Sequence, residues 1–311
     1  MELVMRVLAI GEGMVEFRQD SAGGWQRAHG GDVVNTAIHL ARFGFGSALF
    51  SALGLGAFSD YLFGEWQGEG LQLDYVSRTA QADCGVYFIA VDAHGERTFT
   101  YRRKNSAATL MMQLADEQAL RKALMSADLI YFSLISLAIL AEPDRQALLD
   151  SLGEVRAAGK AVAFDNNYRP QLWGSAQEAR LWHGRALRCV SIGLPTMDDD
   201  IALGIASDHA SVAAHWHDHG VAEIVVKAGR QGALVDGAML APDQAIEQPT
   251  DTSGAGDAFN GGYLAARLHG KSRIEAARAG NKLASWVVQQ RGAIPPVNAA
   301  MYRPGDEIPG V

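Results

Sequence analysis

An aspartate that follows two glycines is the strongest chemical signal in the sequence. Residues 251–257 read DTSGAGD, and the chain then continues into 258–266, where apolar residues keep helical spacing. A Gly-rich turn that opens a helix presents the unpaired N–H groups and the positive dipole end of the first helical turn. Because Gly254 and Gly256 let the backbone approach a ligand closely, the pattern predicts an anion site with phosphate as its natural ligand.

Asp257 lies inside this predicted anion site, where a further negative charge is unexpected. A carboxylate is useful there if it removes a proton from a hydroxyl while the amides of Gly254, Ala255 and Gly256 stabilise the charge on a moving phosphoryl group. The alternative is that Asp257 only complements the helix dipole and that the glycines serve a tight turn. Local sequence leaves both interpretations open.

Short apolar runs separated by helical patterns must position these residues. Five runs are predicted strands, at residues 4–10, 129–132, 161–164, 190–192 and 224–226. Strands that alternate with helices predict an α/β fold with a mostly parallel central sheet and helices on both faces.

One region breaks the alternation. Residues 86–91 and 98–103 are β-prone runs joined by the polar connection 92–96, which predicts a hairpin. Together with 24–29 it predicts a small antiparallel sheet that cannot bury both faces alone. We expect this sheet to be a lid over an active site; the alternative is an edge hairpin without a function.

The chain as a whole resembles the ribokinase (PfkB) family of sugar kinases. The family's motifs recur in its order, as GGD at 30–32, DNNYR at 165–169, KAGRQG at 227–232 and DTSGAGD at 251–257. The resemblance implies one ribokinase-like kinase domain over 1–311, with a β lid from about 12–30 and 84–104. In the family the aspartate after Gly-Ala-Gly is the base, which implies that role for Asp257.

The same resemblance implies which residues bind the two substrates. Acceptor-binding residues would be Gly31, Asp32, Asn35, Tyr87, Tyr101, Arg103, Arg169 and Asp257. ATP-binding residues would be Asn167, Thr196, Lys227, Gly229, Gly232, Gly254, Gly256 and Asn281. Mg²⁺ would be held between phosphates and protein mostly through water, so no metal-ligating side chain is predicted, and a monovalent cation is left open. The amides of 254–256 and Arg169 would hold the transferred charge.

Three strings resemble the branch of the family that phosphorylates 2-keto-3-deoxygluconate. They are GEGMVE at 11–16, SLAIL at 136–140 and FDNNYRP at 164–170. The residues agree physically, because the planar forks of Arg103 and Arg169 suit the carboxylate of a sugar acid. Tyr87 and Tyr101 can each offer a ring face and a hydroxyl. A kinase for fructose or another neutral sugar is the alternative, and a degenerate sugar-sensing protein is the alternative outside enzymes.

Two places depart from the family pattern. Gly56 stands where the family usually has an aspartate near the sugar hydroxyls, which puts its contact with a ligand in doubt. Thr196 and Asp199 stand where the family has an Asn-x-x-Glu pair that helps to organise Mg²⁺ and phosphate. The sequence does not decide whether they replace that function.

Composition bears on partners and location. The 311 residues carry a net charge of -8 without a Lys or Arg run, which predicts neither a nucleic-acid nor a membrane partner. Cys84 and Cys189 are too few for a disulfide framework and favour a reducing cytoplasm. No Gly-x-Gly completes a dinucleotide fingerprint, which argues against an NAD-dependent oxidoreductase. The exposed edge of the predicted lid favours a homo-oligomer, a dimer through the lid or larger.

Overall fold

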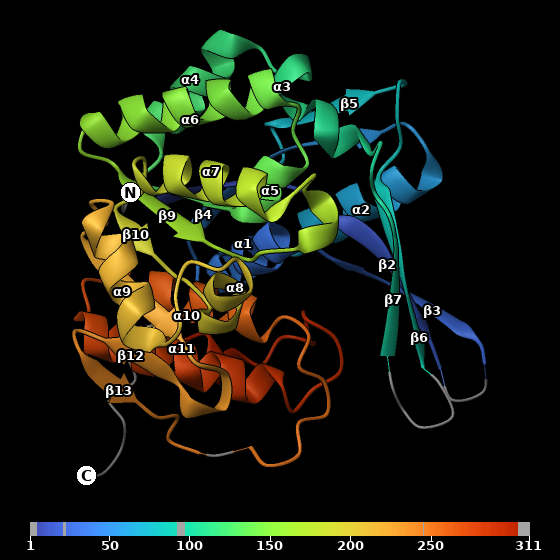
Figure 1. The fold of residues 1–311 in the computed structure, drawn as a ribbon. Coiled ribbons are helices and arrows are strands. Elements are labelled where there is room, and N and C mark those ends of the chain that lie inside the picture. Colours follow the sequence, from blue (N-terminus) through green and yellow to red (C-terminus); the bar gives the residue numbers. More distant parts are fainter. Residues whose placement is uncertain (1–4, 21–22, 92–96, 245, 304–311) are drawn as a thin grey trace.

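A nine-stranded sheet forms the centre of the molecule in a computed structural model that describes residues 5–20, 23–91, 97–244 and 246–303 (Figure 1). Its strands are β1 (Arg6–Ile10), β4 (Gly46–Gly54), β5 (Val76–Thr79), β8 (Leu129–Ser133), β9 (Ala161–Asp165), β10 (Ile192–Gly193), β11 (Glu223–Lys227), β12 (Ala233–Val235) and β13 (Ala238–Leu240). The order is β13-β12-β11-β10-β9-β8-β1-β4-β5. Pairing is parallel from β5 to β11 and antiparallel beyond it. The predicted mostly parallel sheet is confirmed.

Helices cover both faces of this sheet because its strands are apolar on both faces. Along β1, Leu8 and Ile10 belong to one buried cluster, whereas Val7 and Ala9 belong to another. The first cluster includes side chains of α3 (Met111–Leu114), α4 (Glu117–Ser126), α5 (Leu134–Ala138), α6 (Glu142–Ala157), α7 (Ala176–Leu187) and α9 (His209–Asp218). The second includes α1 (Asp32–Arg42), α2 (Ala57–Gly68), α10 (Ala255–Leu268) and α11 (Arg273–Val287). The short helix α8 (Met197–Ala202) follows β10.

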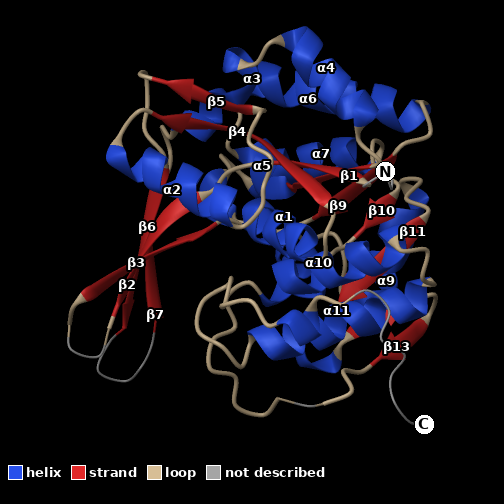
Figure 2. Ribbon diagram, turned by 180° about the vertical axis from the view of Figure 1, so that it is seen from behind, coloured by secondary structure: helices blue, strands red, loops and turns tan. Residues whose placement is uncertain are grey.

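A separate four-stranded sheet, the lid, projects from one side of the body (Figures 1 and 2). Its strands are β2 (Met14–Gln19), β3 (Trp25–Gly30), β6 (Gly85–Val91) and β7 (Arg97–Arg102), in the order β3-β2-β6-β7. Antiparallel pairing of β6 with β7 confirms the predicted hairpin, whose connection 92–96 lies outside the described residues. The lid is not wholly antiparallel, however, because β2 pairs with β6 in parallel. β2 follows β1 in the chain and β6 follows β5, so both strands run outward from the main sheet in the same direction.

The strand order reverses at β1. From β1 the chain passes to β4 and β5 on one side, and later to β8, β9, β10 and β11 on the other. Ligands of open α/β sheets bind outside the carboxyl ends of the strands at such a switch point. Asp165 ends β9 and Lys227 ends β11, so the motif side chains meet at this edge. No helix in the described part of the chain is long and apolar enough to cross a membrane.

Candidate active site

A cavity of about 1570 Å³ lies between the lid, the carboxyl ends of the strands and the start of α10. Sequence-predicted residues along its wall are Gly31, Asp32, Asn35, Tyr87, Tyr101, Arg103, Asn167, Arg169, Thr196, Lys227, Gly229, Gly232, Gly254, Ala255, Gly256, Asp257 and Asn281. The structure therefore brings together every residue that the sequence placed in the site. The cavity exceeds the roughly 300–1,000 Å³ of a pocket for one small ligand, so it has room for two.

The start of α10 forms the Gly-rich turn. Gly254 caps the helix with a φ of 72°, and a Cβ at this position would lie 2.5 Å from the Cβ of Ala293. Both the left-handed backbone and the close packing therefore require glycine. The turn aims the first helical N–H groups at the cavity, although the Ala255 N–H also makes a long hydrogen bond of 3.3 Å to the Thr252 carbonyl. The geometry is that of an anion site.

Asp257 lies in the first turn of α10 and is 9% exposed. Burial raises the pKa of its carboxyl to about 8, the negative charges of Asp32 and Asp165 act in the same direction, and a hydrogen bond from Asn35 opposes them. That bond joins Asn35 Nδ2 to Asp257 Oδ2 over 2.7 Å. A carboxylate whose pKa lies near the working pH is suited to accept a proton.

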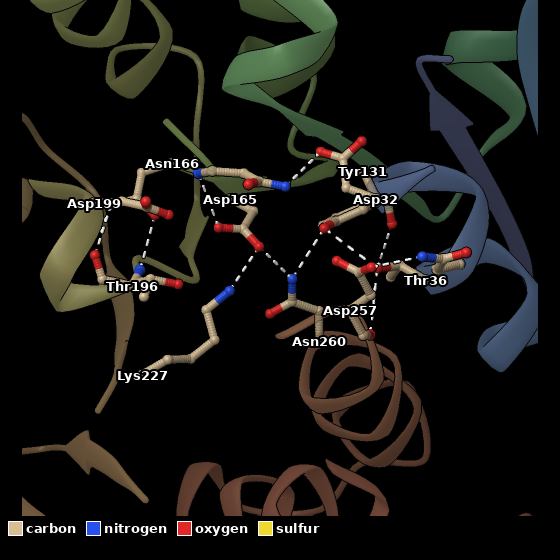
Figure 3. Close-up of polar contacts among 12 residues, drawn as sticks. Asp32, Thr36, Tyr131, Asp165, Asn166, Thr196, Asp199, Lys227, Asp257 and Asn260 are labelled. Carbon is tan, nitrogen blue, oxygen red and sulfur yellow. Dashed lines mark hydrogen bonds and ion pairs between the residues drawn. The ribbon is translucent and has the colours of Figure 1, made fainter. Parts of the chain in front are cut away.

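Asp165 links the two halves of the site through its Oδ2 atom. This oxygen accepts hydrogen bonds from Lys227 Nζ at 2.6 Å and from Asn260 Nδ2 at 2.6 Å, while Asp257 lies beyond Asn260 beside Asp32 (Figure 3). Lys227 and Asp165 are both buried, so this ion pair is satisfied within the protein. The pair fixes Lys227 near the turn, since a Cβ on Gly256 would lie 3.7 Å from Nζ.

Thr196 and Asp199, the residues in the place of the family's Asn-x-x-Glu, both line the cavity. Asn166 holds Thr196 from both sides, accepting its N–H at 2.8 Å and donating to its carbonyl at 2.9 Å. Burial raises the pKa of the Asp199 carboxyl, while Arg169, with Nη1 at 3.4 Å from Asp199 Oδ1, acts against the rise. These two residues offer oxygen atoms to the cavity, which suits water bound to Mg²⁺.

Arg103, predicted to offer its planar fork to an acceptor carboxylate, is already paired within the protein. Its Nη2 lies 2.6 Å from Oε2 of the buried Glu12, whose Oε1 accepts a hydrogen bond of 2.6 Å from Ser106 Oγ. Nε of Arg103 is buried and has no hydrogen-bond partner among the described residues. The sequence reasoning did not name Glu12 as a site residue, although a charged residue two positions after the end of the first strand was a signal. Arg169, with its side chain 47% exposed, is the more open of these two arginines.

The tyrosines of the lid lie opposite each other on β6 and β7. The rings of Tyr87 and Tyr101 stack with centroids 5.6 Å apart. Tyr87 is 9% exposed and its hydroxyl donates to Glu16, whereas Tyr101 is 46% exposed. Tyr101 therefore offers a ring face and a hydroxyl to the cavity, and Tyr87 supports it.

In the loop after β11, the two predicted glycines differ. A Cβ on Gly232, which has a φ of 93°, would lie 2.0 Å from the Leu240 carbonyl oxygen, so packing alone requires this glycine. No atom lies within 4 Å of a Cβ at Gly229, which leaves space beside it. Asn281 Nδ2 donates to the same Leu240 carbonyl at 3.1 Å.

The carboxylate of Asp83 occupies the space where a side chain at position 56 would lie. A Cβ on Gly56 would lie 2.0 Å from Asp83 Oδ2, and Asp83 Oδ1 accepts hydrogen bonds from Ser59 Oγ and from the Cys84 N–H, the latter at 2.8 Å. Asp83 thus fills the side-chain position of residue 56 at the start of α2, and it lines the cavity. The sequence reasoning did not single out Asp83.

The chain is similar to known proteins over nearly its whole length. The family profile described as pfkB family carbohydrate kinase matches residues 5–300. The 2-dehydro-3-deoxygluconokinase of Dickeya dadantii (strain 3937) is 41% identical over 303 residues, which cover 94% of this chain and 97% of that protein. Its namesake from Escherichia coli (strain K12) is 40% identical over 304 residues, covering 94% and 98%.

The fold is similar to the crystal structure of 2-dehydro-3-deoxygluconokinase from Thermotoga maritima. The TM-score is 0.84, over 96% of this chain and 98% of that chain. At 20% sequence identity, this likeness speaks for the fold alone.

Proposed function

This chain belongs to the PfkB family of carbohydrate kinases, and from that membership we propose that it transfers the γ-phosphoryl group of ATP to the 6-hydroxyl of 2-keto-3-deoxy-D-gluconate. The product is 2-keto-3-deoxy-6-phosphogluconate. This acceptor, also named 2-dehydro-3-deoxygluconate, is the one that the names of the relatives carry. The observation that best supports phosphoryl transfer is the buried Asp257 beside the anion-binding turn, in the cavity that the lid tyrosines and Lys227 also line.

Asp257 is the proposed general base. In its ionised form it removes the proton of the 6-hydroxyl, and that oxygen then attacks the γ-phosphorus in line while the bond to ADP breaks. The N–H groups at the start of α10 and the guanidinium of Arg169 hold the charge on the transferred group. The oxygens of Thr196 and Asp199, which line the cavity, would hold water ligands of Mg²⁺, and the ion would supply positive charge to the phosphates.

The acceptor carboxylate is the proposed ligand of the two arginines. Arg169 brings the open charge, while Arg103 adds the buried Nε–H, whose position Glu12 holds. The carboxylate of a sugar acid pairs with both arginines, whereas a neutral sugar would leave the buried Nε–H of Arg103 poorly paired. This difference supports 2-keto-3-deoxygluconate over fructose.

In this proposal, the nucleotide lies in the part of the cavity that is lined by residues from the C-terminal half of the chain. Lys227 and Gly229 would contact phosphates or ribose, and the space beside Gly229 supports this placement. Asn281 and Ala284 of α11 would lie at the base end. Gly232 would act through the shape of its loop. The reducing cytoplasm predicted from the two cysteines would supply the ATP.

An acceptor panel tests the proposal. ADP release would be measured at fixed Mg-ATP with 2-keto-3-deoxygluconate, fructose, ribose and no acceptor. We expect kcat/KM for the sugar acid to exceed that for either neutral sugar by about 100-fold or more, the scale expected when a buried donor loses its partner. Equal values for fructose would move the assignment to a neutral-sugar kinase. A rise in melting temperature with the acceptor, but without ADP formation, would indicate a sugar-sensing protein.

A further inference from the structure

A chain of polar contacts outside the catalytic set joins the lid to the anion-binding turn. Glu16 and Arg18 lie two residues apart on β2, so they share a face of the lid, and Glu16 pairs with Tyr87 on β6. The Tyr87 hydroxyl donates to Glu16 Oε2, and Nε and Nη2 of Arg18 each lie 3.0 Å from Glu16 Oε1. Nη1 of Arg18 donates to Asp251 Oδ2, in the loop before α10.

Asp251 in turn holds the loop that carries Gly254. Its Oδ1 accepts the Ser253 N–H at 3.0 Å, and its Oδ2 accepts the Gly292 N–H at 3.0 Å. These bonds tie the loop to the segment whose Ala293 packs against Gly254. Burial acts to raise the pKa of the Asp251 carboxyl, but the hydrogen bonds from Ser253, Gly292 and Arg18 outweigh it and hold the pKa well below its usual range. Asp251 is therefore ionised at working pH.

The guanidinium of Arg18 has the geometry to serve both carboxylates at once. Its planar fork contacts Glu16 with one edge and Asp251 with another, which a lysine ammonium on a flexible stem cannot reproduce. The Asp251 side chain is 0% exposed and that of Arg18 is 19% exposed, so solvent screens this contact weakly. Loss of the cation would leave Asp251 without its charge partner from the lid, and the lid would lose this contact with the turn.

We propose that Arg18 is a positioning residue that couples the lid to the anion-binding turn, so that the acceptor side at Tyr87 and the phosphoryl side at Gly254 are aligned through one contact. The inference rests on the proposed function, which places the acceptor at the lid and the γ-phosphoryl group at the turn. Arg18 touches neither substrate in this account. Its loss misaligns them, and therefore lowers kcat more than it weakens the binding of either substrate.

Steady-state kinetics test the coupling with three variants. Arg18→Met removes the charge and keeps the length, Arg18→Lys keeps the charge without the fork, and Arg27→Met is the matched control. Arg27 lies on the neighbouring strand β3 opposite Phe17, so its side chain is on the other face of the lid from Glu16 and Arg18, where it stacks over Tyr61 at 3.8 Å. We expect Arg18→Met to lower kcat about 10-fold or more with both KM values within about threefold, because small misplacements of reacting groups are costly. Arg18→Lys should be intermediate, and Arg27→Met should match the wild type.

Hydrogen exchange of the unliganded protein separates this inference from the proposed function. Peptides across 251–256 should exchange faster in Arg18→Met than in Arg27→Met, whichever acceptor the enzyme uses. Equal exchange, or faster exchange with unchanged kcat, overturns the coupling. A wild-type protein that phosphorylates no acceptor in the panel, yet shows the exchange difference, overturns the proposed function and supports the contact between lid and turn.

Discussion

Asp257 combines an acidic side chain, burial and a position at a helix start that attracts anions. Each of these features affects the pKa of its carboxyl. Burial and the nearby Asp32 and Asp165 raise its pKa to about 8, so the carboxyl is mostly protonated at neutral pH before substrates bind. The carboxylate must be ionised to act as a base. The activity of the enzyme should therefore increase as the pH rises towards and through this pKa.

Asp257→Asn is expected to lower kcat by about 10²- to 10⁴-fold while Mg-ATP binding stays within a few fold, because only proton removal is lost. In the wild type, log kcat/KM for the acceptor should rise with pH and level off near the pKa of about 8. Stopped assays across pH 5 to 10 and titration calorimetry with an ATP analogue provide the measurements. A variant within tenfold of wild type, or a profile flat from pH 6 to 9, would contradict the assignment.

Arg103 and Glu12 form a buried pair, so the two residues must be changed together to separate stability from recognition. Arg103→Met alone leaves Glu12 buried without its cation, and should lower the free energy of unfolding by about 3 kcal/mol. Adding Glu12→Gln should recover most of that stability but not the activity towards the sugar acid. Denaturant unfolding and the acceptor panel provide the two readouts.

The double variant gives the decisive comparison. If it regains both stability and the preference for the sugar acid over fructose, Arg103 does not recognise the carboxylate.

Among the elements, the start of α2 shows one part of the fold completing another. Gly56 lacks a capping side chain, and the carboxylate of Asp83, from the segment before β6, occupies the space where that side chain would lie. Asp83 accepts a hydrogen bond from the hydroxyl of Ser59 in the first turn of α2, so it places a negative charge beside the positive end of that helix.

A double-mutant cycle tests whether Asp83 occupies the place of a side chain at position 56. Gly56→Asp should destabilise the protein because two carboxylates then compete for one site, and Asp83→Ala should reverse much of that loss. We expect a coupling of about 1 to 2 kcal/mol between the positions in thermal or denaturant unfolding. Gly64→Asp is the matched control in the same helix, since a Cβ there meets no atom within 4 Å. Its effect should add to that of Asp83→Ala without coupling.

At the scale of the whole molecule, the lid has two unlike faces. Glu16, Tyr87 and Tyr101 line the cavity, while Phe17 and Phe88 lie on the other face, stacked with centroids 5.5 Å apart. Trp25 packs edge-on against Phe88 and is 49% exposed. Phe17 also packs against Phe58 of α2, whereas Trp25 keeps much of its apolar surface exposed, and this exposed surface supports the proposed dimer through the lid.

Trp25→Glu is expected to shift the protein from dimer towards monomer, because a charge would then lie in the apolar outer face of the lid. Size-exclusion chromatography with light scattering measures the mass. Leu181→Glu is the matched control, since Leu181 is 52% exposed on α7, far along the chain from the lid. A wild-type protein that is monomeric at micromolar concentration would contradict the proposal.

The sequence by itself determined the α/β class, the hairpin and the site motifs, because each depends on local pattern. Alternation of apolar runs specifies strands, Gly254 and Gly256 before an apolar helix specify the turn, and Asp165 and Lys227 at strand ends must meet at one edge of a parallel sheet. Such features can be read from neighbouring residues. They placed Asp257 correctly at a helix start.

Only the tertiary structure decided which distant residues pair. Arg18 contacts Asp251, which is 233 positions away in the sequence, and Glu12 forms an ion pair with Arg103. The carboxylate of Asp83 fills the space beside Gly56. No local pattern encodes these contacts, because they depend on strand order and on the parallel path of β2 beside β6. The pKa of Asp257 belongs here too, since burial and neighbouring charges exist only once the chain has folded.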